Sequence, residues 1–425
     1  MKIAIRGGRV IDPANNFDTV SDVFIDRGVV TAIGAAPSEF ETNSNIDASG
    51  KIVCPGFVDL RARLREPGQE HKATMDSELR AAVSAGITSL CCPPDTYPVI
   101  DTPAMVHMVR QRAAELQLTQ VHPLGALTIG LAGERLTNMS ALQDAGCIGV
   151  GNALQPVENT LVMRRAMQYA ASFDITVFIH AHDSWLLGNG CVHEGEVSTR
   201  LGLPAIPEAA ETVAVARELA LIETTGVRAH FCELSCARAV AMVADAQQRG
   251  LPVTADVSAH HLHLTEHDIG FFNTQCHVRP PLRSATDRDA LRSATRDNVV
   301  QAICSDHQPH EVDAKLAPFS ESEPGISGLE TLLSLTLKLV ADGLLELPHA
   351  LATITCGPAR VLGIDTGHLR VGAAADICVF DPDSIWVVDP DSMLSQGRNT
   401  PYTGWSLPGQ VCQTLIGGRL VYEQE

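Results

Sequence analysis

Eight short apolar runs, each followed by a segment with helical spacing, constrain the fold of this chain more than any other feature. In segments such as 75–86 and 208–226, apolar residues recur every three or four positions, which is typical of amphipathic helices. Apolar runs without alternation indicate strands that are buried on both faces, as in a parallel sheet. The runs lie at residues 52–60, 86–92, 121–127, 147–153, 175–181, 227–233, 251–258 and 299–305.

Eight strand–helix units in succession predict a closed barrel. A (β/α)8 barrel takes about 250 residues, and the chain has 425. The alternative is a doubly wound open sheet, which carries a glycine-rich phosphate loop after its first strand. No such loop follows the first apolar run. We therefore expect an α/β protein whose residues 55–356 form a TIM-like barrel.

The two ends of the chain have a similar residue pattern, which differs from that of the middle. Both consist of short strand-like runs separated by glycine and aspartate, without a helical period. This pattern is typical of antiparallel strands joined by turns. We expect residues 1–54 and 357–425 to form one composite β-sandwich beside the barrel.

Charge and hydropathy exclude several classes of partner. The net charge of −19 opposes binding to a polyanionic nucleic acid. No run approaches the roughly 20 apolar residues of a membrane span, and the start of the chain carries no signal-peptide pattern. The twelve cysteines, several of them inside apolar runs, indicate buried thiols rather than disulfides. We expect a cytoplasmic protein with no nucleic-acid or membrane partner.

Polar side chains gather where the apolar runs end, which is where barrels of this type place their active sites. Histidine, glutamate and aspartate from several strands could build a metallohydrolase centre. Arginine cannot take part in metal binding, because a guanidinium has no lone pair and stays protonated. The histidine-rich stretch 258–268 is expected to be a loop without a ligand role. The candidates at strand ends are Arg61, Arg63, Arg65, Asp95, Asn152, Ala153, His180, His182, His230, Glu233, Asp306, His307 and His310.

Ordered blocks along nearly the whole chain resemble the dihydroorotases of the amidohydrolase superfamily, in their long bacterial form. The resemblance implies an amidohydrolase barrel, zinc in the active relatives, and a place in pyrimidine biosynthesis. The blocks include "PGFVDLRARLREPGQEHKATMDSELRAAVSAG", "PVTADVSAHHLHLT", "SDHQPH", "PGISGLETLLSL" and "GHLRVGAAADICVFDP".

The metal positions that this resemblance implies are altered in this chain. Active relatives carry His-x-His at positions 61 and 63, an aspartate at 153 and a histidine at 233. We expect no zinc and no catalysis, with Asp306, the proton carrier of active relatives, left vestigial. The vestigial metal site would comprise Arg61, Arg63, Ala153, His180, Glu233 and Asp306.

The substrate pocket implied by the resemblance is altered as well. Arg65 and His310 match positions that hold the substrate in the family. Asp95 and Arg279 stand where asparagine is usual. We expect the added negative charge of Asp95 to repel a carboxylate like that of orotate.

The loss of metal would leave Glu233 and Asp306 as neighbouring carboxylates without counter-charge. We expect Arg61 and Arg63 to supply that charge as ion pairs, since alternate residues of a strand point to the same side. The simpler alternative is that both arginines face solvent.

Three functions remain open from the sequence. The first is a non-catalytic homologue that supports aspartate transcarbamoylase, binding its catalytic chain as a homo-oligomer, expected to be a dimer, within a larger complex. The second is an active cyclic amidohydrolase, of dihydroorotase, hydantoinase or allantoinase type, with one metal on His180, Glu233 and Asp306 and His182 as an optional fourth ligand. The third is a ligand-binding sensor in which Arg65 and Arg279 hold a carboxylate.

Overall fold

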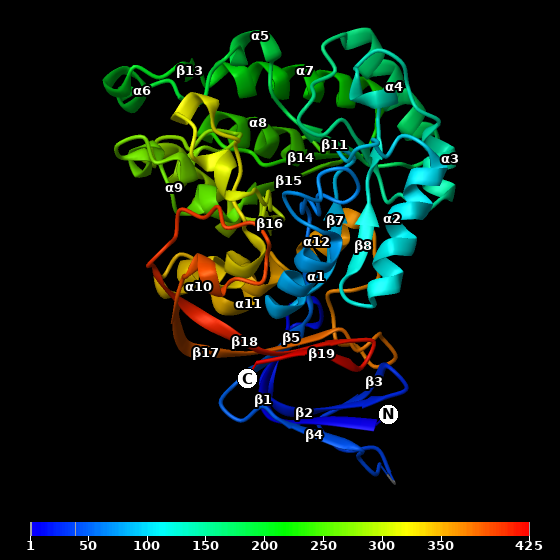
Figure 1. Ribbon diagram of the computed structural model, residues 1–425. Coiled ribbons are helices and arrows are strands. Elements are labelled where there is room, and N and C mark those ends of the chain that lie inside the picture. The colour runs from blue at the N-terminus through cyan, green and yellow to red at the C-terminus, as the bar shows by residue number, and fades with distance from the viewer. Residues whose placement is uncertain (1, 39, 425) are drawn as a thin grey trace.

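The computed structural model describes residues 2–38 and 40–424. Helices surround a parallel barrel in one half of the molecule, and strands from both chain ends lie together in the other half (Figure 1). The predicted α/β class, a barrel with a β-domain built from both termini, is confirmed.

The strands of the two chain ends join into one hydrogen-bonded sheet. Its order is β19-β18-β17-β5-β1-β2-β3, and β4 pairs with β1. The two ends meet where β17 runs antiparallel to β5, with Cys378 opposite Cys54. The strands are β1 (Lys2–Asp12), β2 (Phe17–Asp26), β3 (Val29–Ile33), β4 (Ser44–Asp47), β5 (Ile52–Pro55), β17 (Ile377–Val387), β18 (Ser406–Ile416) and β19 (Arg419–Glu423).

This sheet folds over an apolar core of its own. In Figure 1, β17 to β19 lie above β1, β2 and β4, so the sheet has two layers, as a sandwich does. Side chains from both chain ends fill the space, including Ile5, Val23, Ile377 and Leu415. The two ends therefore depend on each other for burial of their apolar faces.

Each of the eight apolar runs contains a barrel strand within the described residues. Neighbouring strands pair in parallel. β8 and β9 lie in one apolar run, which changes its hydrogen-bonding partner between them: β8 and Leu124 N–H bond to the β7 side, whereas Gly125 N–H and β9 bond to the β10 side. The strands are β6 (Phe57–Asp59), β7 (Ile87–Cys92), β8 (Gln120–Pro123), β9 (Gly125–Ala126), β10 (Val150–Gly151), β11 (Val177–His180), β14 (Ala229–Cys232), β15 (Val253–Ser258) and β16 (Ala302–Cys304).

The barrel closes between its first and last strands. Ala62 and His307 form a parallel bridge, and the Asp59 carboxylate accepts hydrogen bonds from the backbone N–H of Ser305 at 2.8 Å and from its hydroxyl at 2.5 Å. This closure fixes the residues that follow β6 directly beside those that follow β16.

Helices cover the outside of the barrel, and their ends carry local signals. α1 begins after Thr74, whose side chain accepts a hydrogen bond from Ser77 N–H, and α7 ends at Gly226 with a φ of 68°. Such caps satisfy backbone groups that the helix leaves unpaired. The helices are α1 (Met75–Ser84), α2 (Pro103–Leu116), α3 (Met139–Asp144), α4 (Thr160–Ser172), α7 (Ala209–Thr225), α8 (Ala237–Gln248), α9 (Ala285–Arg296), α10 (Leu332–Ala341), α11 (Leu347–Ala352) and α12 (Cys356–Leu362).

The loop after β11 contains short elements: α5 (Ser184–Leu187), β12 (Val192–His193), α6 (Glu196–Leu201) and β13 (Ala205–Ile206).

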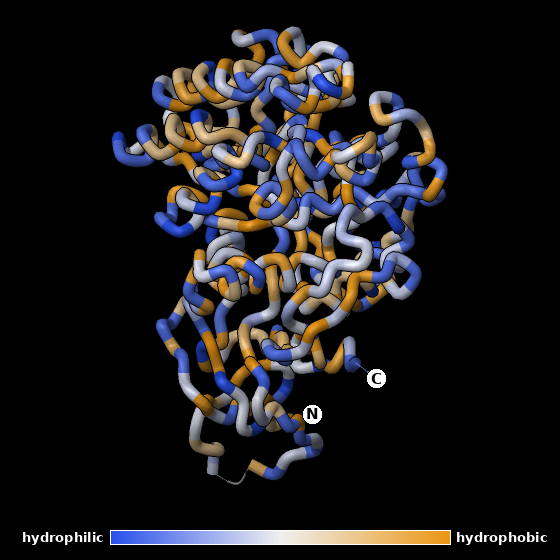
Figure 2. Tube along the Cα trace, turned by 90° about the vertical axis from the view of Figure 1, so that its left-hand side faces the viewer, coloured by the Kyte–Doolittle hydropathy of each residue, from blue (hydrophilic) through white to orange (hydrophobic). Residues whose placement is uncertain are grey.

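Hydrophobic and hydrophilic residues alternate along the outer helices (Figure 2). All twelve cysteines are free thiols, and eleven are buried. Across residues 2–38 and 40–424, no helix combines the length and apolar character needed to cross a membrane.

Candidate functional site

Arg61 and Arg63 lie at the carboxyl end of β6, inside the mouth of the barrel. The backbone of Arg63 donates to His307 O at 3.0 Å, and His307 N–H donates to Arg61 O at 3.1 Å. Both side chains point inward from this bridged segment, and each of the two residues is 4% exposed. The alternative in which the arginines face solvent is therefore wrong.

The two arginines contact the carboxylates that end other strands. Arg61 Nε lies 2.8 Å from Glu233 Oε1 and 3.6 Å from Asp306 Oδ1. Arg63 Nη1 lies 3.5 Å from Asp306 Oδ1. The ion pairs expected from the sequence are thus present, with Asp306 shared between both guanidinium groups.

Arg63 has a second partner that the sequence did not predict. Its Nε donates to Asp95 Oδ2 at 2.8 Å. Asp95 was expected to present a free negative charge to the pocket, and this expectation is corrected, because the guanidinium neutralises it. The pKa of Asp95 is lowered from its ordinary value, since the charges of Arg63 and Arg61 outweigh the effect of burial.

The backbone holds Glu233 and Asp306 in an uncommon conformation. Their φ angles are 56° and 42°, and Ala153 has a φ of 49°. Left-handed backbone at residues other than glycine costs about 1–3 kcal/mol and concentrates at functional sites. Three of the positions that the family resemblance marks as metal-binding therefore have a strained backbone in this chain.

Hydrogen bonds complete the surroundings of the two carboxylates. Glu233 Oε2 accepts from His180 Nδ1 at 2.9 Å. Asp306 accepts from Gln308 Nε2 at 3.0 and 3.1 Å. Gln308 was not among the sequence candidates, although its place two residues after Asp306 puts it on the same rim.

Burial and charge set the protonation states in this cluster. Burial and the nearby Glu233 raise the pKa of Asp306 well above its ordinary value. Burial and the charges of Arg61 and Arg63 lower the pKa of His180 well below its ordinary value, so its imidazole is neutral. Burial disfavours the charge on Arg61, but the adjacent carboxylates more than offset this and raise its pKa.

These side chains do not fit a divalent cation. Guanidinium nitrogens lie within 3.6 Å of both Glu233 and Asp306 and cannot act as ligands. The two fixed positive charges would also repel a cation. At an effective dielectric constant near 20, the repulsion between two unit charges 4 Å apart is about 4 kcal/mol. His180 already donates to Glu233. The arrangement therefore neutralises the carboxylates of Glu233 and Asp306.

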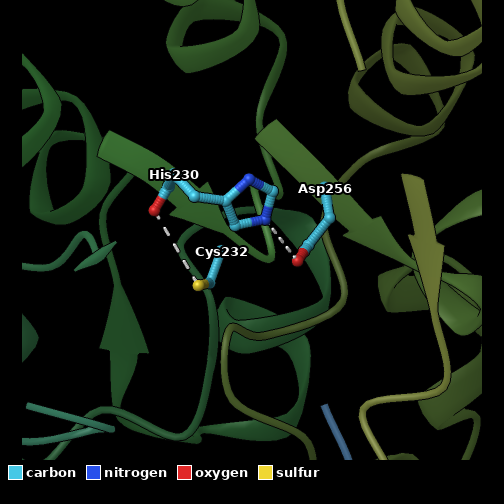
Figure 3. A group of neighbouring side chains, drawn as sticks. All are labelled: His230, Cys232 and Asp256. Carbon is cyan, nitrogen blue, oxygen red and sulfur yellow. Dashed lines mark hydrogen bonds and ion pairs between the residues drawn. The ribbon is translucent and has the colours of Figure 1, made fainter. Parts of the chain in front are cut away.

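Figure 3 shows a second group, formed by His230, Cys232 and Asp256, whose side chains lie within 4.8 Å of one another. His230 Nε2 donates to Asp256 Oδ2 at 2.9 Å, and its other ring nitrogen is 2.8 Å from Thr254 Oγ1. Asp256 Oδ1 accepts the backbone N–H of Glu233 at 2.6 Å. Burial raises the pKa of the Cys232 thiol well above its ordinary value, which disfavours the thiolate that a metal needs.

The group in Figure 3 therefore serves as a support for Glu233. Asp256 engages both of its oxygens inside the protein and holds the backbone of the strained residue. Asp256 was missed from the sequence. Its signal was a carboxylate inside the otherwise apolar run 251–258, which requires a buried partner.

The substrate positions implied by the family resemblance lie on the rim of the barrel. Arg65 Nε donates to Pro309 O at 3.0 Å, and its Nη2 lies 3.2 Å from His310 Nε2. Burial and the charge of Arg65 lower the pKa of His310 to about 2, so this histidine is neutral. Arg279 is half-buried on another rim loop.

Several other candidates have structural partners. Asn152 accepts from Thr128 Oγ1 at 2.8 Å and donates to two backbone carbonyls. His307 lies 2.7 Å from Glu78 of α1 and turns away from the cluster. Ala153, His180 and His182 line a cavity of about 30 Å³, enough for one or two waters. In the histidine-rich stretch 258–268, the ring Nε2 atoms of His261 and His263 form hydrogen bonds with backbone carbonyls.

The fold and sequence of the chain are similar to those of known proteins. A family profile described as dihydro-orotase-like matches residues 50–238. The chain is 50% identical over 425 residues to a "Dihydroorotase-like protein" of Pseudomonas putida, with 100% of each chain covered. It is 50% identical over 423 residues to a protein of the same name in Pseudomonas aeruginosa, again covering 100% of each. A "Dihydroorotase" of Syntrophus aciditrophicus is 43% identical over 426 residues, with 100% of both chains covered.

Solved structures at lower identity share the architecture. An L-hydantoinase (dihydropyrimidinase) from Arthrobacter aurescens superposes with a TM-score of 0.89 at 23% identity, covering 99% of this chain and 96% of its own. A dihydropyrimidinase from Brevibacillus agri superposes with a TM-score of 0.86 at 21% identity, covering 100% and 95%. At this identity the likeness establishes the fold alone.

Proposed function

This chain belongs to the dihydroorotase-like family of the amidohydrolase superfamily, and on that premise we propose that it is a non-catalytic member of pyrimidine biosynthesis. In this role it acts as a structural subunit that supports the assembly and activity of aspartate transcarbamoylase. Its partner is the transferase's catalytic chain, and the chain itself forms a homo-oligomer, expected to be a dimer, in the cytoplasm.

The observation that carries the proposal is the position of Arg61 between Glu233 and Asp306, at 2.8 and 3.6 Å. Hydrolysis of a cyclic amide in this superfamily needs a metal that lowers the pKa of bound water from about 15.7 toward 7. A guanidinium supplies neither a coordination site nor a base. Asp306 contacts two arginines, so its carboxylate is already engaged by fixed positive charge.

The backbone of the altered centre supports a structural role. Positions 153, 233 and 306 have left-handed backbone, and the barrel closes through the bridge between Ala62 and His307. Relatives that cover 100% of the chain at 50% identity are named dihydroorotase-like rather than dihydroorotase. The partner itself is inferred from the family resemblance.

The test of the partner is reconstitution with the transferase. The catalytic chain of aspartate transcarbamoylase, expressed with and without this chain, is compared by light scattering and by carbamoyl-aspartate formation. We expect a larger complex and higher transferase activity with this chain present. A transferase that assembles and works equally well alone would remove the proposed role.

The second candidate is an active cyclic amidohydrolase with one metal at His180, Glu233 and Asp306. It is favoured by the name "Dihydroorotase" of a relative that is 43% identical over its full length and by the clustering of these three side chains. Elemental analysis of purified protein tests it. Stoichiometric zinc favours the active enzyme, and protein without zinc after purification in zinc-supplemented buffer excludes it.

A further inference from the structure

A cavity of about 420 Å³ lies where the barrel meets the β-sandwich. Its walls come from the end of α1, the start of α10, the strands β17, β18 and β19, and the loop after β17; these helices and strands lie against one another in Figure 1. Ligand pockets of about 300–1,000 Å³ occur preferentially at such junctions between domains. The cavity therefore has the size and position of a small-molecule site, and it shares no residue with the cluster of Arg61, Glu233 and Asp306.

Hydrogen bonds fix the buried part of the lining. Trp386 Nε1 of β17 donates to Ser334 Oγ of α10 at 2.9 Å, and Ser334 Oγ donates to Gly409 O of β18 at 3.1 Å. The buried side chains of Leu333 and Val411 complete this part of the lining. Because these contacts join three elements, the cavity is a fixed feature of the fold rather than a gap between loops.

Two aromatic side chains line this space from different strands. Trp386 comes from β17 and Tyr422 from β19, and both are half-buried. Leu394, which is 49% exposed, lies at the rim. The faces of aromatic rings attract cations as well as apolar groups, and tryptophan does so most strongly. The lining therefore fits a ligand with an apolar body and favours a positive charge on it.

The charged side chains of the lining are all negative. They are Glu330, in the turn before α10, and Glu423, at the end of β19, and the lining contains no lysine, arginine or histidine. Glu330 accepts the backbone N–H of Leu394 at 2.9 Å and that of Ser395 at 3.1 Å, and Glu423 accepts from Gln413 Nε2 at 3.0 Å. Neutral donors thus orient both carboxylates, and within the described residues no ion pair joins either of them to a basic side chain.

The surroundings of Glu330 disfavour its negative charge. Burial raises its pKa to about 7, against the lowering effect of its backbone donors. Of the other charged groups around it, Glu78 raises this pKa further and Arg398 lowers it, and Tyr422 and Glu423 line the same cavity. A cation bound beside Glu330 would therefore favour its ionised form.

We propose that this cavity binds a small organic cation, namely a protonated amine on an aromatic or aliphatic body. Each oxygen of Glu330 accepts one backbone N–H and keeps a lone pair for the ammonium group, while Glu423 adds negative potential at the rim. The apolar body packs against Trp386, Tyr422 and Leu333, where the ring faces add cation–π attraction. The inference goes beyond the proposed function and does not depend on it.

Three compounds with the same phenyl ring and different charge test the proposal. Phenethylamine is the cation, phenethyl alcohol the neutral analogue and hydrocinnamate the anion, and ligand-observed NMR titration at pH 8 measures their affinities. We expect the amine to bind about tenfold or more tightly than the alcohol, since it adds a charge-assisted hydrogen bond, and the anion to bind most weakly. Equal affinity of amine and alcohol would overturn the recognition of charge, and no binding of the amine would overturn the site.

Charge-neutralising variants locate the site. Glu330→Gln should weaken phenethylamine binding about tenfold, and Glu423→Gln should weaken it less, because that carboxylate is exposed. Glu423→Gln also keeps the test decisive if Glu330→Gln disturbs the loop that donates to it. Glu346→Gln removes an exposed carboxylate outside the lining and is the control, with unchanged binding. Wild-type affinity in the folded lining variants would refute the location.

The pH dependence separates recognition by Glu330 from general attraction to an acidic protein. With a pKa of about 7 for Glu330, its ionised fraction rises about tenfold from pH 6 to pH 8, while the amine stays protonated. The affinity of the wild type for phenethylamine should therefore rise about tenfold over this range, and that of Glu330→Gln should stay nearly constant. A wild-type affinity that does not change with pH would contradict the role of Glu330.

Discussion

Replacement of Arg61 by methionine should destabilise the protein by about 3–5 kcal/mol, the cost of removing one partner from a buried ion pair. Arg61 Nε lies 2.8 Å from Glu233 and 3.6 Å from Asp306. At an effective dielectric constant near 20, contacts of these lengths are each worth about 5–6 kcal/mol before desolvation. The net loss is smaller, because proton uptake and water entry relieve part of the exposed charge.

Equilibrium urea unfolding at neutral pH, followed by circular dichroism, measures this loss. The control is Arg80→Met on α1, where Arg80 Nε is 3.0 Å from Asp76 Oδ2 but both side chains are exposed. Surface pairs of this kind contribute about 0–1 kcal/mol. The double variant Arg61→Met with Glu233→Gln should recover part of the loss, since it removes one uncompensated charge. If Arg61→Met costs no more than Arg80→Met, the reasoning about buried charge is wrong.

Three further predictions follow from the same contacts. Asp95→Asn should cost about 1–3 kcal/mol in urea unfolding, because the acceptor 2.8 Å from Arg63 Nε loses its negative charge; an unchanged midpoint would contradict this. Asp256→Ala should unfold at lower urea than Asp256→Asn, since asparagine keeps an oxygen for Glu233 N–H; equal midpoints would exclude the supporting role. As the pH is lowered from 6.5 to 4.5, the free energy of unfolding should fall by about 1.4 kcal/mol per pH unit for each buried neutral histidine. The reason is that the pKa of each of these histidines is lowered in the folded protein, so the unfolded state binds more protons in this pH range. A flat pH profile would contradict the prediction. These histidines, with pKa lowered to about 4 except for about 3 at His182, are His182, His261, His263 and His277.

The barrel was predictable because most of its strands are buried on both faces and therefore leave largely apolar runs. All eight runs contain strands in the described residues. That the two chain ends form one domain was predictable only from their similar pattern of short strand-like runs separated by glycine and aspartate. Which strands pair, with β17 against β5, depends on long-range packing that no local pattern records.

The positions of Arg61 and Arg63 at the mouth were predictable from the two-residue period of a strand. Their partners were predictable only in part. Arg63 forms ion pairs with both Asp95 and Asp306. The pair with Asp95 arises because the loop after β7 brings this carboxylate close to Arg63, and the spacing of residues along a strand does not predict the path of a loop. Asp256 accepts a hydrogen bond from the backbone of Glu233, which is far from it in the sequence. Gln308 donates to Asp306 within one loop, and no motif marks this contact in the sequence.

Dihydroorotate hydrolysis, assayed on the purified protein with added zinc, tests the central claim most directly. The guanidinium groups of Arg61 and Arg63 contact Glu233 and Asp306, at positions that the family resemblance marks as metal-binding. We expect turnover no faster than the uncatalysed reaction at every zinc concentration. Zinc-dependent turnover that rises to a plateau at one metal per chain would contradict the account.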